Sequence, residues 1–353
     1  MTPKVFATGV TGYVGGDVLH TILQAHPDWQ YSFLVRNRTR LGSLAKDYPS
    51  IRVVEGDLGD LDILKSEAAS ADIVLHFASS DDRPAVQAIL EGLGSDSNVR
   101  FFIHTSGTAN LLWDDISNGT LGIKRTKVYD DVEDIKTITS FPDAVPHRPV
   151  DKLVLGASAT YPNIRQAIVC PPAILGVGRG AGNKRTIQVP LFVELSLQRG
   201  KVFEIEQGEA AWSFVHIHDL SDVYLRLTES AAVGGGTSDW GPEAYYFAEN
   251  GELQWGAIAR SIAKHLHEAG ALGTDEVESL SAEGASKLNP MLSWTGGMNS
   301  KSRASRARRV LGWKPQVSDF TDSLKEVIQQ DLEAEKTRLQ EIAEGHFPKQ
   351  VKE

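Results

Sequence analysis

The sequence has only one cysteine, Cys170, in 353 residues, so no disulfide can form within the chain. It has no run of about 18 apolar residues, which excludes a transmembrane helix. Its first residues lack the long apolar stretch and cleavage site of a signal peptide. Basic residues are also outnumbered, because 36 Lys and Arg face 46 Asp and Glu, for a formal net charge of −10. Since an acidic surface repels nucleic acids and anionic membranes, we expect neither of them as a partner. Together, these absences lead us to expect a cytoplasmic protein with a small-molecule partner.

Recognisable metal-ligand sets are missing as well. The pair His216 and His218 has no acidic or cysteine partner at a suitable spacing, so we expect no metal site. What the chain does have is length and apolar content, 353 residues and 41% hydrophobic side chains, enough for about two domains with a large core.

Strand and helix signals alternate through the first part of the chain, and again around residues 150–170. The predicted strands are 5–8, 31–35, 51–54, 72–77, 100–104 and 164–170, and the predicted helices are 14–24, 40–46, 85–93 and 150–161. Such alternation indicates right-handed βαβ units, and therefore an α/β fold with a Rossmann-type doubly wound parallel sheet. Residues 107–146 look irregular, and a long charged helix is predicted over 319–343.

The strongest motif is the turn from Thr8 to Gly15, between the first predicted strand and the first predicted helix. There, Gly9 permits a tight turn, Gly12 lets the backbone approach a pyrophosphate, and Gly15 lets the helix pack on the strand. The helix N-terminus offers free N–H groups to the phosphates. The motif therefore predicts a bound nicotinamide dinucleotide.

The end of the second predicted strand bears on which dinucleotide is bound. An acidic residue there would bind the adenosine 2′-OH and favour NAD, but the sequence has Arg36, followed by Arg38. Because guanidinium groups clamp phosphate, we expect NADP(H), with NAD(H) as the alternative.

Several further segments occur in a familiar order and spacing. They are the Thr8–Gly15 turn, Gly56-Asp57-Leu58, His76 to Ser79, Pro171 to Gly176, Phe214 to Leu220 and Leu311 to Pro315. Together they resemble the extended short-chain dehydrogenase/reductase superfamily, in its atypical, NAD(P)-dependent epimerase/dehydratase-like form. The resemblance implies a Rossmann domain over residues 1–175, to which 213–250 return. It implies a smaller C-terminal α/β substrate domain from 176–212 and 251–353.

The same resemblance, with the turn and the two arginines, assigns the cofactor contacts. The expected residues are Gly9, Thr11, Gly12, Tyr13, Val14, Gly15, Arg36, Arg38, Asp57, Leu58, Phe77, Ala78, Ser79, Lys152, Pro171 and Ile174.

The catalytic set departs from the family pattern of Ser/Thr, Tyr and Lys, in which Tyr-x-x-x-Lys lies on one helix face. Lys152 stands at the lysine, but Arg148 occupies the tyrosine position, and arginine is a poor proton donor. Histidine can donate near neutral pH, and His147 precedes Arg148, although it shares a helix face with Asp151 rather than Lys152. The candidates for proton donor are therefore His147, Tyr129 of the irregular segment, and water.

Hydroxyl groups follow the strand at 100–104. Ser106 or Thr108 could hydrogen-bond a substrate oxygen, although Gly107 aligns with the family's catalytic serine. Trp212 stands where nucleotide-sugar enzymes of the family have an arginine, which suits an apolar or aromatic ligand.

These features predict an NADP-dependent oxidoreductase for a small, fairly apolar or aromatic carbonyl or alcohol. Two alternatives stay open: a non-catalytic NAD(P) sensor, favoured by the missing tyrosine, and a nucleotide-sugar epimerase or dehydratase, disfavoured by Trp212. The sequence is compatible with a homodimer.

Overall fold

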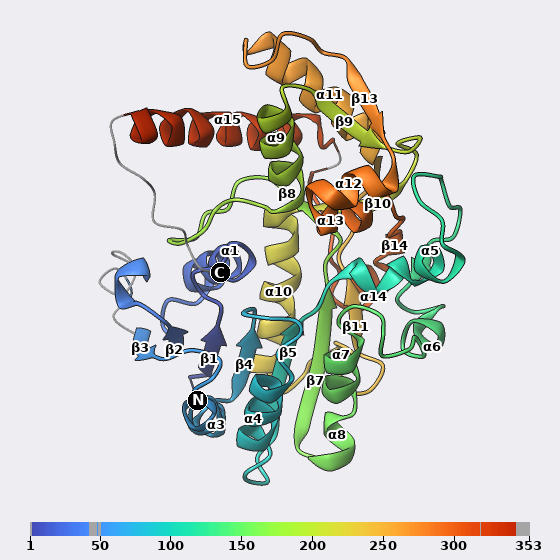
Figure 1. The fold of residues 1–353 in the computed structure, drawn as a ribbon. Coiled ribbons are helices and arrows are strands. Elements are labelled where there is room, and N and C mark those ends of the chain that lie inside the picture. The colour runs from blue at the N-terminus through green and yellow to red at the C-terminus, as the bar shows by residue number, and fades with distance from the viewer. Residues whose placement is uncertain (1, 42–47, 49–50, 318, 344–353) are drawn as a thin grey trace.

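A computed structural model describes residues 2–41, 48, 51–317 and 319–343, and its centre is a seven-stranded sheet (Figure 1). The strand order is β11-β7-β5-β4-β1-β2-β3, and every pairing in the sheet is parallel. The strands are β1 Lys4–Thr8, β2 Gln30–Val35, β3 Ile51–Glu55, β4 Ile73–His76, β5 Arg100–Thr105, β7 Ile164–Cys170 and β11 Tyr245–Phe247. The predicted Rossmann-type sheet is thus confirmed.

Helices cover both faces of this sheet, which explains why its strands are almost continuously apolar. Helices α1 (Tyr13–Ala25) and α10 (Ile217–Ala232) pack together on one face. The other face carries α3 Leu61–Ser70, α4 Arg83–Leu93, α7 Arg148–Leu155 and α8 Ala157–Thr160. The predicted helix at 150–161 is therefore two helices, separated at Gly156. The predicted helix at 40–46 lies mostly outside the described residues, after the 3-10 turn Arg38–Leu41.

A second apolar core lies beyond the carboxyl ends of the large sheet's strands (Figure 1). It combines a three-stranded sheet, a parallel strand pair and five helices, and its centre is a group of stacked and edge-on rings around Trp255. The elements are β8 Ala173–Leu175, β10 Ala211–His216, β12 Glu252–Gln254, β9 Val202–Ile205, β13 Val277–Leu280, α9 Gln188–Arg199, α11 Trp255–Glu268, α12 Ala282–Leu288, α13 Pro290–Thr295 and α15 Thr321–Ala343.

The chain returns to the first core twice rather than once. Residues 217–248 bring back α10 and β11. Helix α14 (Ser305–Val310) also packs against β11, and Trp313 is buried in the first core, where its indole N–H donates to the Asp219 carbonyl at 2.9 Å. The resemblance assigns residues 304–313 to the smaller domain. In the structure, the small residues and the tryptophan of this segment pack at the edge of the large sheet.

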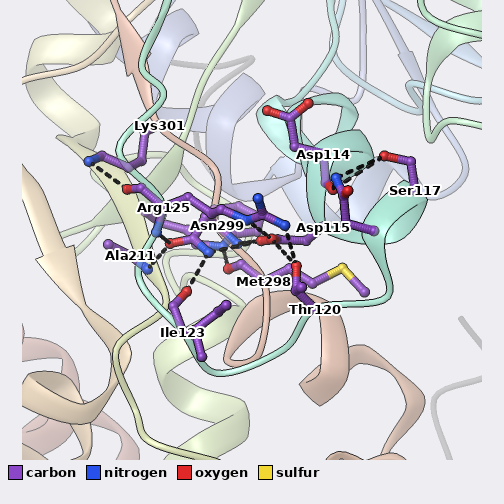
Figure 2. A network of polar contacts seen from close by, with 12 residues as sticks. Asp114, Asp115, Ser117, Thr120, Ile123, Arg125, Ala211, Met298, Asn299 and Lys301 are labelled. Carbon is purple, nitrogen blue, oxygen red and sulfur yellow. Dashed lines mark hydrogen bonds and ion pairs between the residues drawn. The ribbon is translucent and has the colours of Figure 1, made fainter.

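The irregular segment 107–146 contains short elements that a buried carboxylate ties to a distant loop (Figure 2). These elements are the 3-10 turn Thr108–Leu112, α5 Trp113–Asn118, β6 Tyr129–Asp130, which pairs with β14 Ser302–Arg303, and α6 Ile135–Ile138. Asp115 accepts hydrogen bonds from the Asn299 backbone and side chain at 2.6 and 2.9 Å, from Thr120 at 2.7 Å, and from Arg125 at 2.9 Å. None of the helices in the described part of the chain has the length and apolar character of a membrane span.

Candidate active site

A cavity of about 630 Å³, here called cavity A, lies at the carboxyl ends of β1, β2 and β3. It contains most of the residues expected to hold the adenosine and pyrophosphate. Its lining is Thr8, Gly9, Thr11, Gly12, Leu34, Val35, Arg36, Gly56, Asp57, Leu58, Gly59, Phe77, Ala78 and Asn183.

The three glycines of the turn have different surroundings. Gly9 has φ +72°, and a Cβ there would lie 2.6 Å from the Ala78 backbone nitrogen. A Cβ on Gly15 would lie 2.4 Å from the Gly9 carbonyl oxygen, whereas one on Gly12 would meet only that oxygen, at 3.1 Å. Gly12 is the N-cap residue of α1 and has no side chain that could cover the end of the helix. The helix N-terminus therefore opens onto cavity A. This cradle fits a pyrophosphate, because unpaired N–H groups and the helix dipole favour an anion there.

Arg36 follows β2 and lines cavity A. Within the described part of the chain it forms no ion pair, so its guanidinium is available to a ligand. Arg38 and Ser79, also expected at the cofactor, line neither this cavity nor the next one.

A glycine-rich loop at residues 176–182 closes against the phosphate turn. Cβ atoms on Gly180 and Gly182 would lie 2.6 Å from the Gly16 backbone carbonyl carbon and 2.2 Å from the Thr11 carbonyl oxygen, so only glycine allows this approach. Arg179 of the loop binds the buried Asp17 at 2.6 Å. Burial opposes the ionisation of Asp17, but hydrogen bonds from Arg179 and Ser221 hold its pKa below the usual value.

That ion pair, and another between Arg185 and Asp331, pair two arginines of this region with carboxylates of neighbouring helices. They hold the loop to α1 and to α15.

A second cavity of about 730 Å³, here called cavity B, adjoins cavity A, and the two share Gly12, Phe77 and Asn183. Its lining is largely apolar, and neither Lys nor Arg occurs among the described residues that form it. The apolar side chains are Tyr13, Val14, Phe77, Ala109, Leu112, Ala144, Pro146, Pro171, Pro172, Ile174, Ile187, Trp212, Met291 and Trp294. The polar ones are Asp81, Thr105, Ser106, Thr108, His147, Asn183, Thr186, Gln188 and Thr295.

Cavity B thus brings together Ser106, Thr108, His147 and Trp212, which were expected to touch the substrate, with the expected cofactor contacts Tyr13, Val14, Gly15, Pro171 and Ile174. The Thr108 hydroxyl is buried and has no hydrogen-bond partner among the described residues. Trp212 is held by a hydrogen bond from its indole nitrogen to the Met298 carbonyl at 2.9 Å.

His147 lies beside a carboxylate in this cavity. Its Nδ1 lies 3.0 Å from a carboxylate oxygen of Asp81, and its Nε2 faces Gly107, where a Cβ would lie 3.1 Å from that nitrogen. The hydrogen bond with His147 holds the pKa of Asp81 below its usual value. Asp81 was missed from the sequence, although a carboxylate just after β4 sits at the edge where parallel strands place their sites.

Known proteins resemble this chain over part of its length or over most of it. Residues 9–122 match a family model described as NAD(P)H-binding. Oxidase ucsJ of an Acremonium species is 36% identical over 343 residues, which cover 94% of this chain and 99% of that protein. dTDP-glucose 4,6-dehydratase of Mycobacterium tuberculosis H37Rv is 28% identical over 152 residues, 41% of this chain and 43% of the dehydratase.

Solved structures share the fold at low identity. The dTDP-glucose 4,6-dehydratase DesIV of Streptomyces venezuelae, with NAD bound, superposes with a TM-score of 0.67 at 18% identity, covering 95% of this chain and 98% of DesIV. UDP-glucuronic acid 4-epimerase of Bacillus cereus, also with NAD, gives 0.63 at 15% identity, covering 93% and 99%. The chain belongs to the extended short-chain dehydrogenase/reductase superfamily. Its first domain is therefore an NAD(P)-binding domain of an oxidoreductase/dehydratase-like family.

Helix α7 turns the expected lysine away from both cavities. Lys152, expected to hold the nicotinamide ribose, is half-exposed, pairs with Asp143 and lines neither cavity. Because α7 begins at Arg148, its inward face carries Asp151, which is fully buried, while Lys152 points outward. The structure therefore places His147 at cavity B, whereas Asp151 lies buried behind the site and Lys152 faces outward.

Arg148 and Tyr129 are used elsewhere. The Arg148 guanidinium is buried and donates to the Thr139 carbonyl at 2.7 Å. Tyr129 lies on β6, donates its hydroxyl to Asp114 at 2.8 Å and lines neither cavity, and burial raises its pKa. The structure thus does not bring Tyr129, one of the three proton-donor candidates, to the site.

A buried polar chain backs the site in this superfamily member. Asn110 donates to the Tyr245 hydroxyl at 2.5 Å, and that hydroxyl donates to Asp151 at 3.0 Å. Burial raises the pKa of Asp151, against the lowering effect of the neighbouring Ser106 hydroxyl. Sequence reasoning missed Asp151 and Tyr245 as part of the site's support, because β11 joins the sheet from far along the chain.

Proposed function

We propose that the protein is an NADP(H)-dependent oxidoreductase acting on an uncharged, apolar or aromatic carbonyl or alcohol. The observation that carries this proposal is cavity B, which adjoins the dinucleotide cradle and is lined by apolar side chains with no Lys or Arg among its described residues. A substrate bearing a diphosphate would need cationic partners there. A neutral substrate needs only apolar contacts and a few well-placed polar groups.

NADP(H) is favoured over NAD(H) by Arg36. Its side chain lines cavity A at the end of β2, where the adenosine ribose lies in this superfamily, and no carboxylate of the described chain neutralises it. A 2′-phosphate would gain charge-assisted hydrogen bonds from it.

The chain's own groups divide the chemical work. Bound NADPH would supply a hydride from nicotinamide C4 to the carbonyl carbon. The glycine turn and α1 hold the pyrophosphate, and Pro171 and Ile174 line the cavity where the nicotinamide belongs. Thr108, whose hydroxyl is buried without a partner, can donate a hydrogen bond to the substrate oxygen. Trp212 supplies an apolar wall.

A cofactor titration tests the dinucleotide preference. NADPH should bind about 10- to 100-fold more tightly than NADH, since charged hydrogen bonds contribute about 1.5–3 kcal/mol. Arg36→Ala should remove most of the difference, measured by the fluorescence of the bound nicotinamide. Arg38→Ala is the matched control, because Arg38 lines neither cavity, and should keep the preference. Equal affinities for the two cofactors in the unmutated protein would contradict the assignment.

A substrate screen tests the reaction. Neutral aromatic ketones and alcohols should be turned over with NADPH or NADP⁺. UDP- and dTDP-sugars should not be converted, and their Kd should stay above about 100 μM, which corresponds to a binding free energy weaker than about 5–6 kcal/mol. Tight sugar-nucleotide binding would instead support an epimerase or dehydratase. Tight NADPH binding with no turnover of any compound would support a non-catalytic sensor.

A further inference from the structure

We propose that Asp81 and His147 form the acid–base pair of this site. His147 would exchange a proton with the substrate oxygen through Nε2, and Asp81 would be a positioning residue that orients the ring. The inference rests on the proposed function and extends it, because it replaces the superfamily's tyrosine and lysine with residues of other types from other positions.

The first support is the geometry of the pair. His147 Nδ1 lies 3.0 and 3.1 Å from the two carboxylate oxygens of Asp81, so it donates its N–H to the carboxylate. Asp81 follows β4 and His147 precedes α7, and both line cavity B. A carboxylate on Nδ1 selects the tautomer in which Nε2 is free to accept or donate a proton toward the cavity. The His147 side chain is only 17% exposed, so neighbouring groups confine the ring.

The second support is the glycine opposite the ring. Gly107 stands where the superfamily has its catalytic serine, and its φ of −164° is extended backbone that any residue adopts. A Cβ there would lie 3.1 Å from His147 Nε2 and 3.5 Å from Cδ2. Because the backbone does not require glycine, the lack of a side chain has a steric role. It leaves the imidazole the space that a serine side chain would occupy.

The third support is the backbone of His147 itself. Its φ of +67° lies in the left-handed region, which residues with a side chain rarely adopt. The start of α7 holds it, because the His147 carbonyl accepts hydrogen bonds from Val150 and Asp151 at 3.1 and 2.9 Å. This conformation directs the ring into the cavity, while Arg148 and Lys152 turn away.

The proton balance is simple. In the reducing direction, protonated His147 gives its Nε2 proton to the carbonyl oxygen as that oxygen gains the electron pair released by hydride arrival at carbon. The ring is left neutral, still donating Nδ1–H to Asp81, and takes up a proton from solvent. In the oxidising direction, neutral Nε2 removes the alcohol proton. Histidine is suited to both roles near neutral pH.

Kinetics of single variants test the pair with a substrate found in the screen. His147→Gln should lower kcat about 10²- to 10⁴-fold, the usual contribution of general acid–base catalysis, with the affinity for NADPH unchanged within about twofold. Asp81→Asn should lower kcat at least about 10-fold, and Asp81→Glu should restore part of the loss. Asp143→Asn is the matched control, since Asp143 is an exposed carboxylate four residues before His147 that pairs with Lys152 outside the cavity.

A spectroscopic measurement separates positioning from mere structural support. Long-range ¹H–¹⁵N spectra of the protein without cofactor should show neutral His147, assigned by its loss in His147→Gln, as the Nδ1–H tautomer. Asp81→Asn should give a mixture, and Asp143→Asn should not. Gly107→Ser should disturb the same signal and lower kcat, because its side chain would meet the ring.

The outcomes distinguish this inference from the proposed function. Turnover that survives His147→Gln within about threefold, or an Nε2–H tautomer in the unmutated protein, would overturn the pair and leave the oxidoreductase assignment intact. No turnover in a protein that binds NADPH would overturn the proposed function and this inference with it.

Discussion

At the scale of single residues, the three glycines of the phosphate turn carry out different tasks. Gly9 and Gly15 have no room for a side chain, because backbone atoms lie 2.4 to 2.6 Å from where a Cβ would be. Gly12 is less crowded, with the Gly9 carbonyl oxygen 3.1 Å from where a Cβ would be, and it lines both cavities. The first two glycines therefore allow the turn to form, whereas Gly12 leaves space for a ligand.

We expect Gly12→Val to weaken NADPH binding at least about 100-fold while leaving the fold intact, since its branched side chain would fill the path of the pyrophosphate. The backbone of Gly12, at φ −79° and ψ 174°, accepts a β-branched residue. Fluorescence titration gives the affinity, and circular dichroism with thermal unfolding gives the fold. Gly15→Val is the contrasting variant and should fail to fold stably. A Gly12→Val protein that still shows a full NADPH-dependent thermal shift would remove the turn from the binding site.

At the scale of elements, the network around Asp115 connects two walls of cavity B (Figure 2). The 3-10 turn before α5 supplies Thr108 and Leu112 to the lining, and α13, before Asn299, supplies Met291 and Trp294. Asp115 is almost fully buried and accepts from Asn299, Thr120 and Arg125. This carboxylate is therefore one of the groups that fix the distance between the walls, together with the Ser300 hydroxyl, which donates to the Thr108 carbonyl at 2.7 Å.

Asp115→Ala should lower the free energy of unfolding by about 3 kcal/mol or more, because it leaves the Arg125 guanidinium and the Asn299 N–H groups without their shared acceptor. Urea unfolding at pH 7 measures the change. Ser117→Ala, an exposed position in the same helix, should alter stability by less than about 0.5 kcal/mol. An Asp115→Ala protein as stable as the unmutated one would show that the network does not hold the walls together.

At the scale of the whole molecule, buried histidines link stability to pH. Burial lowers the pKa of His76 and His216 to about 4, and that of His104 well below its usual value. A histidine whose folded pKa is depressed stays neutral in the fold but binds a proton when the chain unfolds. Its contribution is therefore fully present above the unfolded pKa of about 6.5 and is lost as the pH falls toward 4. Stability should fall steeply between pH 6.5 and pH 4.

His104 provides the test of this pH dependence. Both of its ring nitrogens are buried without a hydrogen-bond partner in the described part of the chain, beside His76 and Phe102. His104→Phe keeps a flat ring, removes the unpaired nitrogens and should raise stability at pH 5 more than at pH 8. Urea unfolding at the two pH values measures the difference. If the variant and the parent lose the same free energy of unfolding between pH 8 and pH 5, His104 does not contribute to the acid sensitivity.

The sequence by itself determined the parallel sheet, the phosphate turn and the superfamily. Each depends on local signals: apolar runs of strand length, glycines at set spacings, and short motifs in order. Predicted strands such as 164–170 coincide with the observed ones, and most of the expected cofactor residues line cavities A and B. Four of the five strands of the second core, β8, β9, β12 and β13, have only three or four residues, which carry too little periodicity to be predicted.

Only the tertiary structure brings the two residues of the proposed acid–base pair together. Spacing along the chain favoured Lys152, but the backbone at His147 sets where α7 begins, and a rotation of about 100° per residue turns Lys152 outward. Asp81 reaches His147 across 66 positions of sequence, a contact made only when β4 and α7 meet at one edge of the sheet. The steric role of Gly107 is likewise visible only in the tertiary structure, because the His147 ring that it accommodates comes from another element.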